Sequence, residues 1–179
     1  MLKIKMGATE LEEKDITDFT KKSRALLINR ENKVLVANSG GVYLLPGGGC
    51  ELNENSDDTV VRELKEETGL DYKKIDLTKL VTIDHYQKNY PKKDGTITNR
   101  LMSTTYFFGS LFDNVEVNVN SQTLTDSELD AGFRLELIPY NNLRDVLLTN
   151  KTDNHRNKYF VKELLEVMNV YDKINEDRK

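Results

Sequence analysis

Short apolar runs bounded by turn residues dominate the first two thirds of the chain, and this pattern favours β-strands over long helices. Two clusters of small and turn-forming residues, at 38–41 and 46–49, separate the early runs. A basic segment with Gly and Pro at 90–99 interrupts the later runs and is expected to form a loop. The pattern predicts strands at residues 24–29, 33–37, 42–45, 77–86, 101–112, 115–119 and 132–138. Residues 1–20 are expected to be an irregular or strand-like lead-in.

A helix is predicted between the third and fourth of these strands. Ser56 is a suitable N-cap, and Asp57 and Asp58 follow in the first turn, where the helix dipole favours anions. The helix is expected to run to Thr68 and to stop at Gly69, a typical C-terminal capping residue. Its apolar face consists of Val60, Val61 and Leu64.

Two further helices are predicted near the C-terminus, at 141–148 and 155–171. The second has an apolar stripe suited to core packing, formed by Phe160, Val161, Leu164, Leu165, Met168 and Tyr171. Strands on both sides of an early helix, followed by late helices, predict an α+β fold or mixed-sheet sandwich. A length of 179 residues fits one domain over 1–179.

Composition and charge narrow the class of protein. No stretch approaches the roughly 20 apolar residues that span a bilayer, and the N-terminus lacks the apolar stretch of a signal peptide. The single cysteine, Cys50, cannot form an internal disulfide, which favours a reducing cytoplasm. The net charge of −4 argues against extensive electrostatic binding of nucleic acid.

Acidic residues are concentrated in the segment 47–70, where seven acids against two bases give a charge of −5. Glu63, Glu66 and Glu67 stand at i, i+3 and i+4 of the predicted helix, so their carboxylates share one face near its C-terminal end. Like charges at that end repel each other and the helix dipole. A solvated charged face is one interpretation. A site for a hard divalent cation such as Mg²⁺ or Mn²⁺ is the other, because all these ligands are oxygens.

Residues 48–70 match a known motif at all nine constrained positions. They read Gly48, five residues, Glu54, seven residues, then Arg62-Glu63-Leu64-Lys65-Glu66-Glu67-Thr68-Gly69-Leu70. This is similar to the Nudix box, G-x5-E-x7-R-E-U-x-E-E-x-G-U, in which U is a bulky aliphatic residue. Chance produces such a match at well below ~1 in 10⁸ per starting position. The chain is therefore identified as a member of the Nudix hydrolase family, whose best-known type is MutT.

The resemblance implies a mixed β-sheet sandwiched between helices, with residues 47–70 as a loop–helix–loop and 141–171 as C-terminal helices. It also implies Mg²⁺- or Mn²⁺-dependent hydrolysis of a nucleoside diphosphate linked to another moiety. Carried over by position, Glu63, Glu66 and Glu67 bind metal. Glu54 binds metal or helps to activate water, and Arg62 orients the glutamates. A carbonyl of Gly47 or Gly48 is a further metal ligand.

Residues outside the box are weaker candidates. Arg24, Gly48, Tyr86 and Arg100 are candidates for substrate binding, and surface acids near the last strand are candidates for the general base. Tyr86 lies 16 residues past the box, a spacing reported for diadenosine-polyphosphate members, although strand packing explains it equally well. The candidate bases are Glu128, Asp130 and Glu136.

The specific substrate stays open between a nucleoside triphosphate, a dinucleoside polyphosphate and a nucleotide sugar. Two alternatives also stay open: a nucleotide-sensing module that does not turn its ligand over, and an RNA 5′-end pyrophosphohydrolase. Neither membrane contact nor stable nucleic-acid binding is expected. A homodimer is possible.

Overall fold

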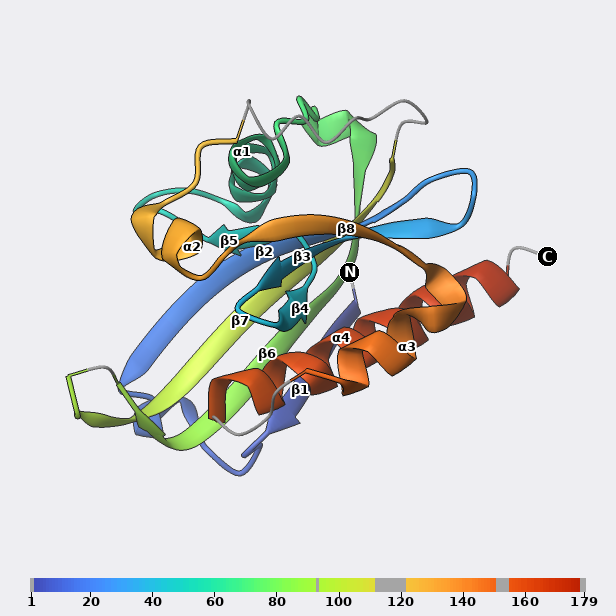
Figure 1. Cartoon of the computed structure of the whole chain (residues 1–179). Coiled ribbons are helices and arrows are strands. Elements are labelled where there is room, and N and C mark those ends of the chain that lie inside the picture. Colours follow the sequence, from blue (N-terminus) through green and yellow to red (C-terminus); the bar gives the residue numbers. More distant parts are fainter. Residues whose placement is uncertain (1, 93, 112–121, 151–154, 178–179) are drawn as a thin grey trace.

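The computed structural model describes all residues except 1, 93, 112–121, 151–154 and 178–179. A mixed β-sheet forms the centre, and helices cover both of its faces (Figure 1). This arrangement confirms the α+β fold that the sequence predicts. The predicted strand at 115–119 lies outside the described residues.

The described elements follow the predicted order with several extensions. The strands are β1 Leu2–Gly7, β2 Asp18–Ile28, β3 Lys33–Ser39, β4 Val42–Leu44, β5 Gly47–Gly49, β6 Leu77–Pro91, β7 Ile97–Ser110 and β8 Arg134–Pro139. The helices are α1 Ser56–Thr68, α2 Asp126–Asp130, α3 Tyr140–Leu148 and α4 His155–Glu176, with short 3₁₀ turns at Glu13–Asp15 and Lys74–Asp76. None of the described helices is long and apolar enough to cross a membrane.

The sheet has the strand order β1-β6-β7-β2-β3-β4, with β5 paired to β2 and β8 paired to β3. Two pairs are parallel, β1 with β6 and β2 with β7, and the others are antiparallel. Within β2, Arg24 pairs with Gly47 of β5. The long strand β2 therefore joins the centre of the sheet to the glycine segment that precedes α1.

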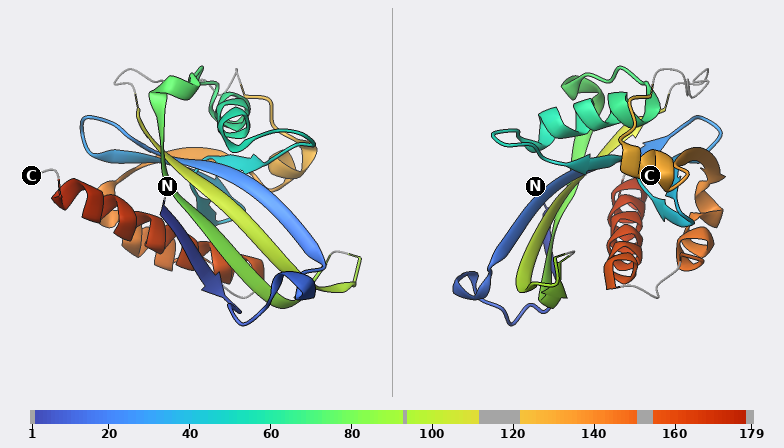
Figure 2. Two further views of the ribbon diagram at one scale, coloured as in Figure 1. Left: turned by 180° about the vertical axis from the view of Figure 1, so that it is seen from behind. Right: turned by 60° about the vertical axis from the view of Figure 1, so that its left-hand side comes forward.

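Each face of the sheet has its own hydrophobic core. Val60 and Leu64 of α1 pack with Ala25 and Leu27 of β2 on one face. On the other face, the apolar stripes of α3 and α4 cover Leu26 and the inward residues of β3, β6 and β7. Figure 2 shows α1 and α4 on opposite sides of the sheet. Alternate side chains of β2 therefore point toward α1 or toward α4, and each candidate site residue on this strand lies on one of these two sides.

The N-cap of α1 differs from the prediction by one residue. Asn55, not Ser56, is the N-cap, because its side-chain oxygen accepts hydrogen bonds from the backbone N–H groups of Asp57 and Asp58 at 3.0 Å each. Asn and Ser are both good N-caps, so the sequence does not separate adjacent candidates. The C-terminal end is as predicted, with Gly69 in the left-handed conformation at φ 71°.

The strand-like alternative for the lead-in is confirmed, whereas the prediction of a loop at 90–99 is wrong. Residues 2–7 form a strand in the sheet, because Ile4 and Met6 pack inward while Lys3 and Lys5 face outward in strict alternation. The predicted loop at 90–99 is a hairpin, in which Tyr90 pairs with Thr98 across a short turn. The short elements β5 and α2 were not predicted, since neither has a hydrophobic period.

Candidate active site

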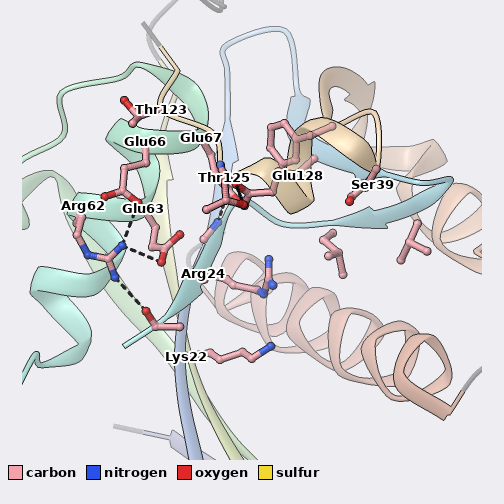
Figure 3. A pocket seen from close by; sticks show the side chains of 18 of the residues that line it. Lys22, Arg24, Ser39, Arg62, Glu63, Glu66, Glu67, Thr123, Thr125 and Glu128 are labelled. Carbon is pink, nitrogen blue, oxygen red and sulfur yellow. Dashed lines mark hydrogen bonds and ion pairs between the residues drawn. The ribbon is translucent and has the colours of Figure 1, made fainter. Parts of the chain in front are cut away.

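A cleft of about 810 Å³ lies where β2, β5, α1, α2 and α4 meet. Figure 3 shows the side chains that line it. One wall is acidic and comes from the C-terminal half of α1, which contributes Glu63, Glu66 and Glu67. The opposite wall has Lys22 and Arg24 of β2. The cleft thus brings carboxylates and cations together across one open space.

Arg62 organises the acidic wall through four hydrogen bonds to carboxylates. Its Nε and Nη2 donate to Glu54 at 3.0 and 2.9 Å, and its Nη1 donates to Glu63 at 2.9 Å and to Glu66 at 3.0 Å. Nη2 also donates to the carbonyl oxygen of Gly49 at 2.9 Å. The guanidinium lowers the pKa of Glu54 to about 2, and Glu54 in turn raises the pKa of Arg62. The repulsion expected among the helix glutamates is therefore offset by one shared cation.

Glu67 is the most deeply placed of the helix glutamates, with 6% of its surface exposed. Its Oε2 accepts a hydrogen bond from the backbone N–H of Gly47 at 2.7 Å. Burial raises the pKa of Glu67 to about 8, although Arg24 and the Gly47 N–H act in the opposite direction. Burial also raises the pKa of Glu63, against the effect of Arg62. These two carboxyls bind protons more tightly than free glutamate does, and a bound cation would compete with those protons.

The three glycines of β5 differ in whether a larger residue would fit at each position and in what it would meet there. Gly47 has φ 129°, and a Cβ there would overlap the backbone of Ser23 and Arg24. At Gly48, a Cβ would overlap the carboxylate of Glu63 instead. At Gly49, a Cβ would meet nothing within 4 Å. Gly47 is therefore needed for the backbone path, and Gly48 for the position of the Glu63 carboxylate.

The cationic wall rests on Arg24, which is 6% exposed. Its Nη1 donates to the carbonyl oxygen of Leu45 at 2.5 Å, and its buried Nε has no hydrogen-bond partner among the described residues. The ring of Phe160 from α4 lies 5.7 Å from the Arg24 guanidinium and 5.1 Å from Lys22 Nζ. Phe160 therefore supports both cations, although the sequence suggested only core packing for it.

Of the three candidate bases, only Glu128 lines the cleft. Its Oε2 accepts hydrogen bonds from the backbone N–H and the hydroxyl of Thr125, both at 2.7 Å. Glu136 is engaged on β8 by Arg134 at 2.8 Å and by the Asn38 amide at 3.0 Å. Asp130 is exposed at the end of α2 and is not part of the cleft lining.

The two substrate-binding candidates from the later strands lie outside this cleft. Arg100 forms an ion pair with Asp18 and stacks on the ring of Tyr90, with 3.8 Å from the guanidinium to the ring centroid. Tyr86 lies on the sheet face away from α4, with Lys5 Nζ 5.9 Å from its ring centroid. The structure therefore brings Arg24 and Gly48 to the glutamates but neither Tyr86 nor Arg100.

Lys22 is a cleft residue that the sequence analysis missed. The predicted strand begins at residue 24, whereas β2 begins at Asp18. Residues two apart on a strand share a face, so Lys22 lies on the same face of β2 as Arg24. Phe160 carried no such signal, because only the packing of α4 brings it to the cleft.

Among the described residues, no three acidic, histidine or cysteine side chains converge as ligands on one point. In this structure the oxygens of Glu54, Glu63 and Glu66 are directed to Arg62. The donor set is nevertheless all oxygen, which is the type that Mg²⁺ and Mn²⁺ prefer. The chemistry of the site fits such a cation, which would compete with Arg62 for these oxygens.

Comparison with known proteins places the chain in a family. A family model described as the NUDIX domain matches residues 19–164. The chain belongs to the NUDIX family. The match spans β2 to the middle of α4, so it includes both walls of the cleft. Within this NUDIX domain, the box residues 48–70 contribute the end of β5, the loop after it, α1 and its cap.

Solved structures of NUDIX proteins share the fold of the chain. A MutT protein from Methanosarcina mazei Go1 is 15% identical with a TM-score of 0.52, covering 90% of this chain and 96% of that chain. A MutT protein from Bacillus halodurans is 18% identical with a TM-score of 0.51, covering 71% and 72%. A NUDIX hydrolase from Nitrosomonas europaea is 15% identical with a TM-score of 0.51, covering 86% and 88%. A search of curated protein sequences found no match.

Proposed function

We propose that the chain hydrolyses a pyrophosphate bond in a nucleoside diphosphate linked to another moiety, with Mg²⁺ or Mn²⁺ as cofactor. One observation carries this proposal: the carboxylates of α1 face Lys22 and Arg24 across a single cleft. A polyphosphate is an anion that needs cations on several sides. Membership of the NUDIX family supports the same general reaction.

Glu63, Glu66 and Glu67 are the residues that would hold the cation, with Gly47 or Gly48 as the source of a backbone oxygen. When bound, the cation neutralises phosphate oxygens and lowers the pKa of the attacking water. Arg62 holds Glu54, Glu63 and Glu66 in fixed orientations, and a bound cation would compete with Arg62 for the oxygens of Glu63 and Glu66.

Arg24 and Lys22 bind the phosphate oxygens from the opposite wall. The unpartnered Nε of Arg24 is a buried donor for one such oxygen, and leaving it unpaired costs about 1–3 kcal/mol. Substrate phosphate would remove this penalty. The positive charges also lower the electrostatic barrier that the acidic wall presents to an anionic substrate.

Glu128 is the proposed base. The two Thr125 bonds to Oε2 orient its carboxyl group within the cleft. In this assignment Oε1 takes the proton from the attacking water as its oxygen bonds to phosphorus and the bridging oxygen leaves with the other phosphate. Glu128→Gln keeps the shape of the side chain and removes its basicity, so we expect a loss of about 10²-fold in kcat.

The test is a panel of nucleotides assayed with Mg²⁺, with Mn²⁺ and with EDTA, with products identified by chromatography. The panel contains nucleoside triphosphates, dinucleoside polyphosphates, nucleotide sugars and 5′-triphosphorylated RNA. We expect cleavage of a pyrophosphate bond that disappears in EDTA and returns with either cation. Full turnover in EDTA would contradict the mechanism. Binding without turnover would favour the sensing module, and cleavage of the RNA alone would favour the RNA pyrophosphohydrolase.

A further inference from the structure

A second, smaller pocket of about 150 Å³ adjoins the active-site cleft. The two cavities share Lys22 and Phe160 in their linings. Beyond this junction the smaller pocket is lined by Thr20, Gln87, Tyr90 and Arg100, among others. None of these four side chains belongs to the Nudix box, and the proposed reaction does not use them. The pocket is therefore a separate feature that opens from the same cleft.

Strand β2 connects the two cavities with a row of polar side chains. Thr20, Lys22 and Arg24 alternate along the strand and face α4. At about 3.3 Å per residue, Thr20 and Arg24 are separated by roughly 13 Å along the strand. Arg24 lines the cleft, Lys22 lines both cavities and Thr20 lines the smaller pocket. An extended ligand bound in the cleft can follow this row into the pocket.

Two buried oxygens in the pocket have no hydrogen-bond partner among the described residues: Gln87 Oε1 and Thr20 Oγ1. Gln87 is 3% exposed. An unsatisfied buried acceptor destabilises a protein by about 1–3 kcal/mol, so a native structure usually has a use for one. Gln87 Oε1 accepts a hydrogen bond from a hydroxyl or an N–H group, and the Thr20 hydroxyl can accept one or donate one. The pocket therefore suits a ligand that brings donors.

The charges around the pocket indicate a neutral group and not another phosphate. The Arg100 guanidinium is paired with Asp18 and covers one face of the Tyr90 ring. Its charge is therefore neutralised within the protein. The two unpartnered oxygens of the pocket belong to an amide and a hydroxyl, so neither supplies a positive charge to offset a phosphate. Lys22 stands at the junction, where the last phosphate would lie.

The volume limits the group to a single ring. At about 30 Å³ per water molecule, 150 Å³ corresponds to about five waters. This is room for one sugar ring, and a base attached to that ring would lie outside the pocket. A sugar also supplies hydroxyl groups, which can donate to Gln87 Oε1 and exchange a hydrogen bond with the Thr20 hydroxyl.

We infer that this pocket binds a sugar ring attached to the distal phosphate of the substrate. The inference rests on the proposed function and narrows it. The preferred substrates would be those with a sugar at both ends of the polyphosphate, as in nucleotide sugars and dinucleoside polyphosphates. A nucleoside triphosphate leaves the pocket unfilled.

The test compares four adenine nucleotides: ADP-ribose, ADP-glucose and diadenosine tetraphosphate, which have a distal sugar, and ATP, which has none. The variants are Gln87→Leu and Thr20→Val, each of which removes hydrogen bonding and nearly keeps the side-chain volume. We expect each variant to lower kcat/KM about tenfold for at least one distal-sugar substrate and to leave ATP unchanged. Which of the three substrates responds identifies the source of the sugar.

Tyr86→Phe is the matched control, because Tyr86 precedes Gln87 in β6 but lies on the opposite face of the sheet. It should behave as wild type with all four nucleotides. Gln87→Leu removes an unpartnered buried oxygen, so its melting temperature should equal or exceed that of wild type. An equal loss of kcat/KM for ATP and for the distal-sugar substrates would overturn the inference, as would no loss for any of them. In either case, continued hydrolysis by the variants would leave the proposed function intact.

If the wild-type protein hydrolyses none of the four nucleotides with Mg²⁺ or Mn²⁺, these substrates provide no support for the proposed function. Titration calorimetry then tests separately whether the pocket binds a sugar. ADP-ribose should then bind about tenfold more tightly than ADP to the wild type and with nearly equal affinity to Gln87→Leu. An unchanged ratio in the variant would refute the pocket.

Discussion

At the scale of single residues, Gly48 and Gly49 offer a sharp comparison. A Cβ at Gly48 overlaps the movable end of Glu63, whereas a Cβ at Gly49 meets nothing. Gly48→Ala should therefore displace the Glu63 carboxylate while the fold persists. Misplacement of a ligand by about 1 Å lowers turnover by as much as about 10²-fold. We expect such a loss in Gly48→Ala, near-normal turnover in Gly49→Ala, and similar melting temperatures. Equal turnover in the two variants would show that the position of Glu63 is unimportant.

Glu67 gives a prediction for the pH dependence of stability without metal. Its pKa is about 8 in the folded protein, against 4.5 for an unperturbed glutamate. The folded state thus holds the proton more tightly than the unfolded chain. The Glu67 contribution to stability is complete below about pH 4.5 and is lost as the pH rises through about 8. In EDTA, the melting temperature of wild type should fall more between about pH 5 and pH 9 than that of Glu67→Gln. Parallel curves would contradict the burial of this carboxyl.

At the scale of elements, helix α4 is fixed to the sheet by a buried carboxylate. Glu163 lies 2.7 Å from Nδ1 of His85 and accepts a hydrogen bond from the Tyr106 hydroxyl at 2.9 Å. Tyr106→Phe leaves one buried oxygen without that donor, and we expect a loss of about 1–3 kcal/mol in unfolding free energy. Tyr140→Phe is the control, since its hydroxyl bonds the half-exposed Asp172. Chemical denaturation should show a smaller loss there, and equal losses would argue against this anchor.

The same helix shows what the sequence could and could not predict. The spacing of the box identified α1, its end at Gly69 and the shared face of Glu63, Glu66 and Glu67, because these features depend on local periodicity. The contacts of Arg62 with Glu54 and with the carbonyl oxygen of Gly49 could not be predicted, because they depend on how the loop before α1 folds back onto the helix. Phe160 reaches the cleft only through the tertiary packing of α4. Local patterns determine elements, but the second wall of the cleft required the whole fold.

At the scale of the whole molecule, the cleft unites two walls that come from distant parts of the chain. A divalent cation that binds the acidic wall of this cleft stabilises the folded state only, because the unfolded chain has no comparable site. The gain is ~2.7 kcal/mol at 100 times Kd. Thermal melts with Mg²⁺ or Mn²⁺ should therefore show a higher melting temperature in wild type and in Asp71→Asn, an exposed acid paired with Lys65. Glu66→Gln should show a smaller shift, and an equal shift would indicate that the cation binds elsewhere.

In the proposed mechanism, metal-dependent hydrolysis by this protein depends on the carboxylates of α1. Its most direct test is the turnover of the best nucleotide of the panel, with saturating Mg²⁺, in wild type, Glu66→Gln and Asp71→Asn. Glu66→Gln nearly preserves shape and removes one ligand charge from the cleft. We expect a loss of about 10²-fold or more in kcat for Glu66→Gln, with Asp71→Asn unchanged. Near-normal turnover in Glu66→Gln would contradict it.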